Sequence, residues 1–270
     1  MSLGLKEYQA RKAEEEARRE AASKPKVNRL SLEKDGDSVI VRFAQELDHD
    51  AKNYNEDRGI GFVNIEHNHP DPKVGWRNRA SCSIETQGAC LPCEKVANRD
   101  VEWADRKGWK QKEKFYINVV AGEPREVKET RNNREYTKYL PTNIDEDTGD
   151  GTVYLLEQGT YNGIYNDLAN YFLESKISGD TITNKYFKIS RKGSGFNDTS
   201  YSVLALQDIP KKAKSLDDFE LYNIKEDVLV EVPYNQQEAF YYRGIESDYS
   251  APAKGAPVEE SEATSTDNDW

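Results

Sequence analysis

The chain has 270 residues, of which 36% are hydrophobic and 32% charged, and its formal net charge is -11. It has no run of about 18 apolar residues and no apolar segment near its start, so the sequence predicts neither a membrane-spanning helix nor a secretory signal. These features favour an intracellular protein with a modest core, in which the three cysteines act as thiols rather than as disulfide partners.

The two ends of the chain differ in composition from its middle. Residues 5–22 are rich in Ala, Glu, Arg and Lys, which is the composition of a helix. We therefore predict a charged helical arm over residues 1–26, either solvated or docked on a second copy of the chain. Residues 27–243 are predicted to be the folded core. Residues 244–270, rich in Ser, Pro, Glu and Asp, are predicted to be a disordered acidic tail.

Between these ends the pattern is typical of short strands. Alternating or β-branched residues predict strands at 39–43, 59–65, 114–120, 153–156, 186–190 and 201–206. Residues 121–124 are predicted to be a turn, and the apolar residues of 161–175 have helical spacing. Six or seven short strands with one helix between the late strands predict a mainly β fold, a small and partly open β-barrel.

All three cysteines follow two histidines within one short stretch of the chain, and Cys90 and Cys93 form a Cys-x2-Cys knuckle. Three thiolates and one imidazole are the ligands that tetrahedral zinc prefers. His67 and His69 can each supply the imidazole, and His69 is favoured because it lies nearer to the cysteines and directly precedes Pro70. We predict a structural Zn²⁺ site without an open position, formed by His69, Cys82, Cys90 and Cys93.

Three stretches, residues 103–116, 131–139 and 185–196, interleave cations with aromatic residues. Single-stranded DNA binding needs cations along the phosphates and rings on which bases stack. About half of the rings, such as Phe115, Tyr154 and Phe187, are expected to be core instead. The candidates for phosphate contacts are Arg106, Lys107, Lys110, Lys112, Lys114, Arg131, Arg134, Lys188, Arg191 and Lys192. The candidates for base stacking are Trp103, Trp109, Tyr116, Tyr136, Tyr139 and Phe196.

The last residues of the acidic tail include Asp267, Asp269 and Trp270. An acidic tail can serve solubility alone. An aromatic residue behind acidic residues also makes a compact anchor for a partner protein, and we predict that these three residues bind a partner.

The same features in the same order resemble the single-stranded-DNA-binding, helix-destabilising proteins of T-even phages. The resemblance covers residues 30–206 and rests on the cysteine spacing, the strand at 39–43, the aromatic strand at 115–120 and the loop at 194–197. It implies an OB-fold, a partly open five-stranded β-barrel, with a zinc subdomain inserted at about residues 55–105. The short N-terminal cluster of basic and hydroxyl residues found in that family is missing here.

The resemblance also implies a role. It implies cooperative, sequence-nonspecific binding of single-stranded DNA in phage replication, recombination and repair, in the cytoplasm of the infected bacterium, without enzymatic activity. The implied partners are replication and recombination proteins, bound through the tail, with self-association through the N-terminal arm as a further expectation.

Two other classes stay open. A zinc-containing nuclease or DNA-processing enzyme would need a second carboxylate or histidine cluster, and His49 is the one remaining histidine. A zinc-ribbon adaptor would bind only protein.

Overall fold

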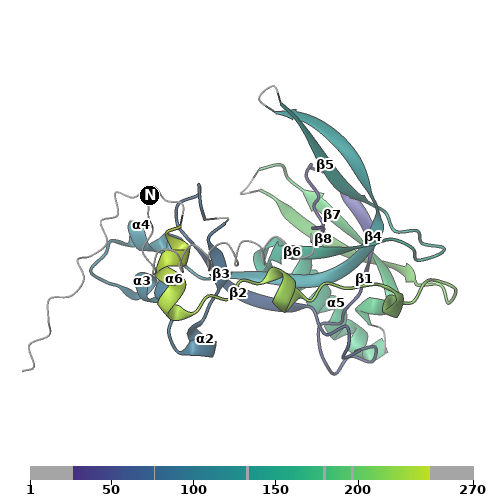
Figure 1. Ribbon diagram of the computed structural model, residues 1–270. Coiled ribbons are helices and arrows are strands. Elements are labelled where there is room, and N and C mark those ends of the chain that lie inside the picture. Colours follow the sequence, from purple (N-terminus) through teal and green to yellow (C-terminus); the bar gives the residue numbers. More distant parts are fainter. Residues whose placement is uncertain (1–26, 76, 132–133, 179–180, 196–197, 244–270) are drawn as a thin grey trace, which may run out of the picture.

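The structure is a computed structural model that describes residues 27–243 except residues 76, 132–133, 179–180 and 196–197. In this part of the chain the fold is mainly β (Figure 1). Eight strands form one sheet in which every strand pair is antiparallel. The strands are β1 (Ser38–Phe43), β2 (Phe62–Asn68), β3 (Arg79–Ser81), β4 (Lys112–Arg131), β5 (Arg134–Thr142), β6 (Thr152–Gly159), β7 (Lys185–Lys192) and β8 (Ser200–Asp208).

The helices connect the strands or follow them. The α-helices are α2 (Ile84–Gln87), α3 (Leu91–Ala97), α4 (Trp103–Arg106), α5 (Ile164–Ser178) and α6 (Tyr234–Tyr241). The shorter turns are η1 (Lys107–Trp109), η2 (Thr160–Asn162), η3 (Ile182–Asn184), η4 (Leu216–Asp218) and the π-type η5 (Ile224–Val228). The helical spacing at 161–175 thus predicted α5 correctly, apart from its ends. None of the helices described is long and apolar enough to cross a membrane.

Strand β4 organises the sheet because it pairs with four other strands, β1, β2, β5 and β6. The prediction that its chain turns at residues 121–124 was wrong: β4 continues to Arg131 and pairs with β5. The register shifts between Gly122 and Arg125, and such a bulge bends a strand without ending it. A Cβ atom on Gly122 would lie 2.1 Å from the carbonyl oxygen of Asn143, so only glycine permits this close approach.

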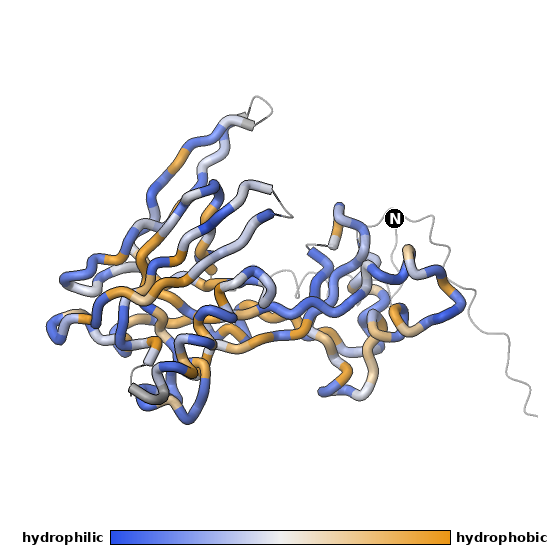
Figure 2. The backbone as a smooth tube through the Cα atoms, turned by 180° about the vertical axis from the view of Figure 1, so that it is seen from behind, coloured by the Kyte–Doolittle hydropathy of each residue, from blue (hydrophilic) through white to orange (hydrophobic). Residues whose placement is uncertain are grey.

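Because of this bend, one hairpin projects from the rest of the sheet. Beyond Gly122, β4 and β5 leave the rest of the sheet as a two-stranded hairpin, and the β7–β8 hairpin rises beside them on the same side (Figures 1 and 2). Figure 2 shows hydrophobic segments concentrated in the body of the sheet, whereas the outer parts of both hairpins are mostly hydrophilic.

The main core lies between the sheet and α5. Ile164 and Leu168 of α5 are fully buried against the inner face of the strands, where the rings of Phe43 and Phe187 meet edge to face at 5.2 Å. Phe115, Tyr154 and Phe187 are at most 2% exposed, which confirms that these rings are core.

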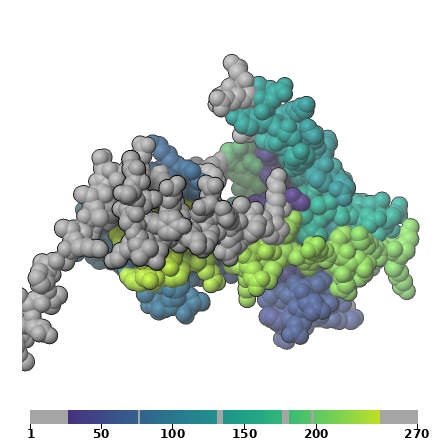
Figure 3. Space-filling view, viewed as in Figure 1, coloured from purple at the N-terminus to yellow at the C-terminus, as the bar shows by residue number. Residues whose placement is uncertain are grey.

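A second, smaller group of elements lies at the other end of the molecule. We call it the small lobe and define it as residues 67–111 together with residues 230–243. Its own core contains Ala80, Trp109, Val232 and Tyr241. The chain reaches it twice, because the segment after β8 returns along the molecular surface and ends in α6 (yellow-green in Figure 3).

Candidate metal centre and basic-aromatic surface

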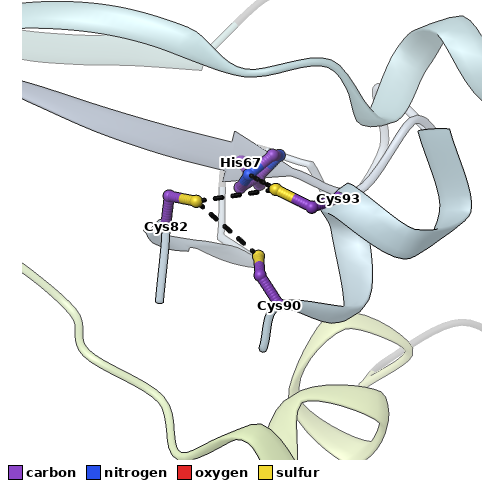
Figure 4. A group of neighbouring side chains, drawn as sticks. All are labelled: His67, Cys82, Cys90 and Cys93. Atoms are coloured by element: carbon purple, nitrogen blue, oxygen red, sulfur yellow. Dashed lines mark hydrogen bonds between the residues drawn. The ribbon is translucent and has the colours of Figure 1, made fainter. Parts of the chain in front are cut away.

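Four side chains of the small lobe point toward one another (Figure 4). They are His67, Cys82, Cys90 and Cys93, and their ligand atoms all lie within 4.8 Å of one another. Cys82 Sγ lies 3.8 Å from Cys90 Sγ and 3.6 Å from Cys93 Sγ, and Cys93 Sγ lies 3.4 Å from His67 Nε2. The group could therefore hold a metal ion.

Each ligand is placed by a different piece of local structure. His67 lies on β2 opposite Ala80 of β3, and Cys82 directly follows β3. Cys90 is the N-cap of α3, and Pro92 and Cys93 are the second and third residues of that helix. Helix α2 fills the interval between Cys82 and Cys90 and ends at Gly88, whose φ of 73° is a left-handed conformation that favours glycine.

The prediction that His69 supplies the imidazole was wrong, because the structure groups His67 with the three cysteines. The Nδ1 atom of His69 accepts a hydrogen bond from the amide of Asp71 at 3.1 Å. Its ring packs edge to face on Trp109 and Tyr242. Distance along the chain favoured His69, but the pairing of β2 with β3 decides which histidine faces Cys82, and spacing does not reveal that pairing.

His67 is fully buried and its orientation is fixed by one backbone group. Its Nδ1 atom lies 2.7 Å from the carbonyl oxygen of Trp109. A carbonyl can only accept a hydrogen bond, so Nδ1 carries a proton and Nε2 is the ring atom that faces the cysteines. The candidate metal ligand His67 is thus connected directly to the backbone of the basic-aromatic stretch at residues 103–116.

The cysteines resist carrying negative charge together. Burial raises the pKa of Cys93, and the neighbouring Cys82 and Cys90 raise it further, to about 12. Burial opposes ionisation of Cys90 as well, but hydrogen bonding by His67 and by backbone amides lowers its pKa to about 6. A bound cation would remove the repulsion between the thiolates, so this donor set fits a metal ion.

A second polar cluster lies between the small lobe and the sheet. Glu157 of β6 binds Arg79 of β3 at 2.5 Å, Lys114 of β4 at 2.5 Å and Arg29 at 3.1 Å. Arg79 Nε also lies 3.3 Å from Glu66 Oε2, an ion pair without hydrogen-bond geometry. The hydroxyl of Tyr116 donates to the other Glu66 oxygen. The cluster connects β3 with β4 and β6. No local sequence pattern predicted it.

The Glu157 cluster predicts a loss of stability in acid. Burial alone would raise the pKa of Glu157, but the hydrogen bonds and charges of Arg79 and Lys114 outweigh it and lower the pKa from 4.5 to about 2. A depressed pKa in the folded state stabilises the fold above pH 4.5, and this contribution of roughly 3 kcal/mol is lost as the pH falls toward 2. Denaturant unfolding should show that the difference in free energy of unfolding between the wild type and Glu157→Gln decreases as the pH falls from 4.5 toward 2. A difference that does not change with pH would contradict this role of Glu157.

Two of the rings predicted to stack on bases are core residues, so these two predictions were wrong. Trp109 is 5% exposed within the small-lobe core, and Tyr116 is fully buried. Trp109 faces Ala80 and Tyr241 because the short turn η1 directs it inward. Tyr116 faces Phe62 of the neighbouring strand β2.

Several predicted phosphate-binding cations are already bound within the protein. Lys114 is paired with Glu157. Arg191 donates to the carbonyl oxygen of Leu32 at 2.6 Å and to Thr199. Arg106 donates to the carbonyl oxygen of Val96 at 2.6 Å. These three side chains hold loops and strands together, and their charge is only partly available to a ligand.

The remaining predicted residues with described side chains are exposed and lie on different parts of the structure. In the small lobe, Trp103 is 44% exposed, and its ring centre lies 5.0 Å from the Arg106 guanidinium and 4.7 Å from Lys110 Nζ. On the β4–β5 hairpin, Tyr136 and Tyr139 are exposed. The exposed cations lie around α4 and on β4 and β7: Lys107, Lys110, Lys112, Lys188 and Lys192.

The two exposed tyrosines of the hairpin lie on opposite faces. Side chains of a strand alternate between faces, so Tyr136 shares its face with Lys138 and not with Tyr139. Lys138 Nζ binds Glu33 at 2.7 Å. Glu33 precedes Asp35, whose carboxylate accepts the amide of Gly193 in the β7–β8 turn at 2.8 Å. The face of the hairpin that carries Tyr136 is therefore directed toward the β7–β8 hairpin, and the face that carries Tyr139 is directed away from the β7–β8 hairpin.

Some predicted residues lie outside the described part of the chain. These are Phe196, the tail residues Asp267, Asp269 and Trp270, and the arm at residues 1–26. Of Arg131 and Arg134, only the backbone is described, in β4 and β5.

Comparison with models of protein families finds no match to this sequence. A comparison with curated proteins finds no match either.

Proposed function

We propose that this chain is a sequence-nonspecific single-stranded-DNA-binding protein that acts in phage DNA replication, recombination and repair. The observation that carries the proposal is the distribution of exposed rings and cations. These residues lie on three different elements. Trp103 and Lys110 belong to the segment of α4 and η1, Tyr136 lies on the β4–β5 hairpin, and Lys188 lies on β7. Rings and cations spread along an extended surface suit a flexible strand, which stacks its bases and neutralises its phosphates at the same time.

We propose further that the sheet is an OB-type barrel with an inserted zinc subdomain. The pairing of β4 with four strands supports this, as does the bridge between Arg29 and Leu155, which brings the start of the described chain to β6. OB-folds commonly bind single strands across one face of such a barrel and between its loops.

The metal in this proposal is a structural Zn²⁺ held by His67, Cys82, Cys90 and Cys93. Zn–S and Zn–N bonds of about 2.3 and 2.05 Å in a tetrahedron place two sulfurs about 3.8 Å apart, and a sulfur and a nitrogen about 3.5 Å apart. The S–S distances of 3.6 and 3.8 Å and the S–N distance of 3.4 Å fit these values. The ion would fix His67, and through it the carbonyl of Trp109 and the segment that carries Trp103 and Lys110.

The proposed role is binding and not catalysis. A nuclease needs a carboxylate or histidine cluster that can bind a catalytic metal ion. Within the described residues, the one such group with metal-binding spacing is the Cys/His cluster itself. Glu66 is 3% exposed, and the Glu157 side chain is 10% exposed and bound to three cations. Cleavage of labelled single strands in the presence of Mg²⁺ would support the nuclease instead.

Titration with oligo(dT) at several salt concentrations tests the DNA proposal. Ring stacking should quench tryptophan fluorescence, since Trp103 is exposed. Neutralising about four phosphates gives a slope of log K against log salt near -3, or roughly 60-fold weaker binding between 50 and 200 mM salt. Absence of binding, or an affinity that does not change with salt, would refute the proposal and favour a protein-binding adaptor.

A further inference from the structure

The C-terminal helix α6 brings one polar side chain into the interior of the small lobe. Gln237 is 1% exposed, although both residues before it, Asn235 and Gln236, are exposed. A buried side-chain amide is stable only when its donors and its acceptor have partners. Each of the polar atoms of Gln237 has one.

The partners of Gln237 lie next to the metal ligands. The amide of Leu91, the residue after Cys90, donates to Gln237 Oε1 at 2.8 Å. Gln237 Nε2 donates to the hydroxyl of Ser83, the residue after Cys82, at 2.7 Å, and to the carbonyl oxygen of Val232 at 3.0 Å. Because an amide N–H can only donate and a carbonyl can only accept, these contacts admit a single orientation of the Gln237 amide.

The Ser83 hydroxyl extends this connection to the other side of the knuckle. It donates to the carbonyl oxygen of Ala89 at 2.6 Å, and Ala89 directly precedes Cys90. The Gln237 side chain and Ser83 thus connect the segment that carries Cys82 with both backbone neighbours of Cys90. The two sulfur atoms lie 3.8 Å apart.

We infer that Gln237 is a positioning residue of the metal site, which sets the separation of Cys82 and Cys90 through hydrogen bonds to Ser83 and Leu91. Groups that orient metal ligands without touching the ion commonly change metal affinity by about 10–100-fold when they are removed. The inference rests on the proposed metal site and is independent of DNA binding.

Three single variants and one double variant test the inference in the full-length protein. Gln237→Met keeps the length of the buried side chain and removes its hydrogen bonds. Gln236→Met makes the same substitution at the exposed neighbouring position and serves as the matched control. Ser83→Ala removes the shared hydroxyl, and its combination with Gln237→Met completes a double-mutant cycle.

Release of Zn²⁺ to an excess of chelator should be about 10–100-fold faster from Gln237→Met than from the wild type, and unchanged in Gln236→Met. The visible spectrum of the Co²⁺-substituted protein should also change in Gln237→Met, because the angles between the thiolate ligands change. If Gln237 only packed α6 against the small lobe, the Co²⁺ spectrum of Gln237→Met would equal that of the wild type. The double variant should release metal more slowly than the product of the two single effects predicts, because both residues act through one network.

Release at the wild-type rate with an unaltered Co²⁺ spectrum in Gln237→Met would overturn this inference alone. A wild-type chain that binds neither Zn²⁺ nor Co²⁺ would overturn the proposed metal site and this inference together. A full multiplicative effect in the double variant would overturn the shared network.

Discussion

Substitution of His67 by alanine is expected to remove the metal, whereas substitution of His69 is not. Four-ligand zinc sites contribute roughly 10–16 kcal/mol, so one ligand accounts for about 3 kcal/mol, and its loss lowers the affinity more than about a hundredfold. His67→Ala also leaves the buried carbonyl of Trp109 without its partner. Metal content after dialysis against a chelator, together with the melting temperature, measures the effect.

His69→Ala is the matched control because the two histidines lie two positions apart. It loses ring contacts with Trp109 and Tyr242 and is expected to lower stability moderately while it retains the metal. The reverse result, with the metal retained by His67→Ala and lost by His69→Ala, would show that the histidine assignment is wrong. If the metal fixes the segment around Trp103, the affinity of His67→Ala for oligo(dT) should fall as well.

Under the proposed function, substitution of Tyr136 by alanine is expected to weaken the affinity for oligo(dT) by roughly 5–150-fold, the range that corresponds to about 1–3 kcal/mol per stacked base. Tyr139→Ala is expected to leave the affinity within about twofold. Both rings are exposed on the same strand, but only Tyr136 shares the face of Lys138, which looks toward the β7–β8 side. Oligo(dT) titration at one fixed salt concentration compares the two variants.

Two outcomes of this comparison carry different meanings. Equal losses in both variants would place the DNA across the tip of the hairpin and not along one face of it. A loss confined to Tyr139→Ala would place the DNA on the opposite face. Thermal unfolding should be nearly unchanged in both variants, since each ring is about half exposed.

Strand positions were predictable from the sequence wherever alternation and β-branched residues are dense. The strands at 39–43, 114–120 and 186–190 correspond to β1, the first half of β4, and β7. The β4–β5 hairpin was not predicted, because its residues are polar on both faces and the Gly122 bulge has the composition of a turn. Charge and hydropathy alone do not separate a projecting hairpin from a loop.

The candidate site was predictable to the extent that its chemistry follows residue identity. The three cysteines and the need for one histidine follow from the sequence, and the structure brings all three cysteines together with a histidine. Strand register and contacts between distant segments decide which histidine joins the cysteines, which rings are buried and which cations are already paired. Glu157 meets Arg79 across 78 positions of the chain, and local patterns do not report such pairs.

The return of the chain from β8 to the small lobe has a consequence for how the protein is made. Gln237 joins Leu91 across 146 positions, so all four candidate metal ligands leave the ribosome long before the helix that completes the small lobe. At about 5–20 residues per second, the interval is roughly 7–30 seconds. During synthesis the thiols therefore exist for a time without Val232 and Tyr241, which form half of the small-lobe core. A fragment that ends before residue 230 would contain every candidate ligand and still lack Val232 and Tyr241 of the small-lobe core.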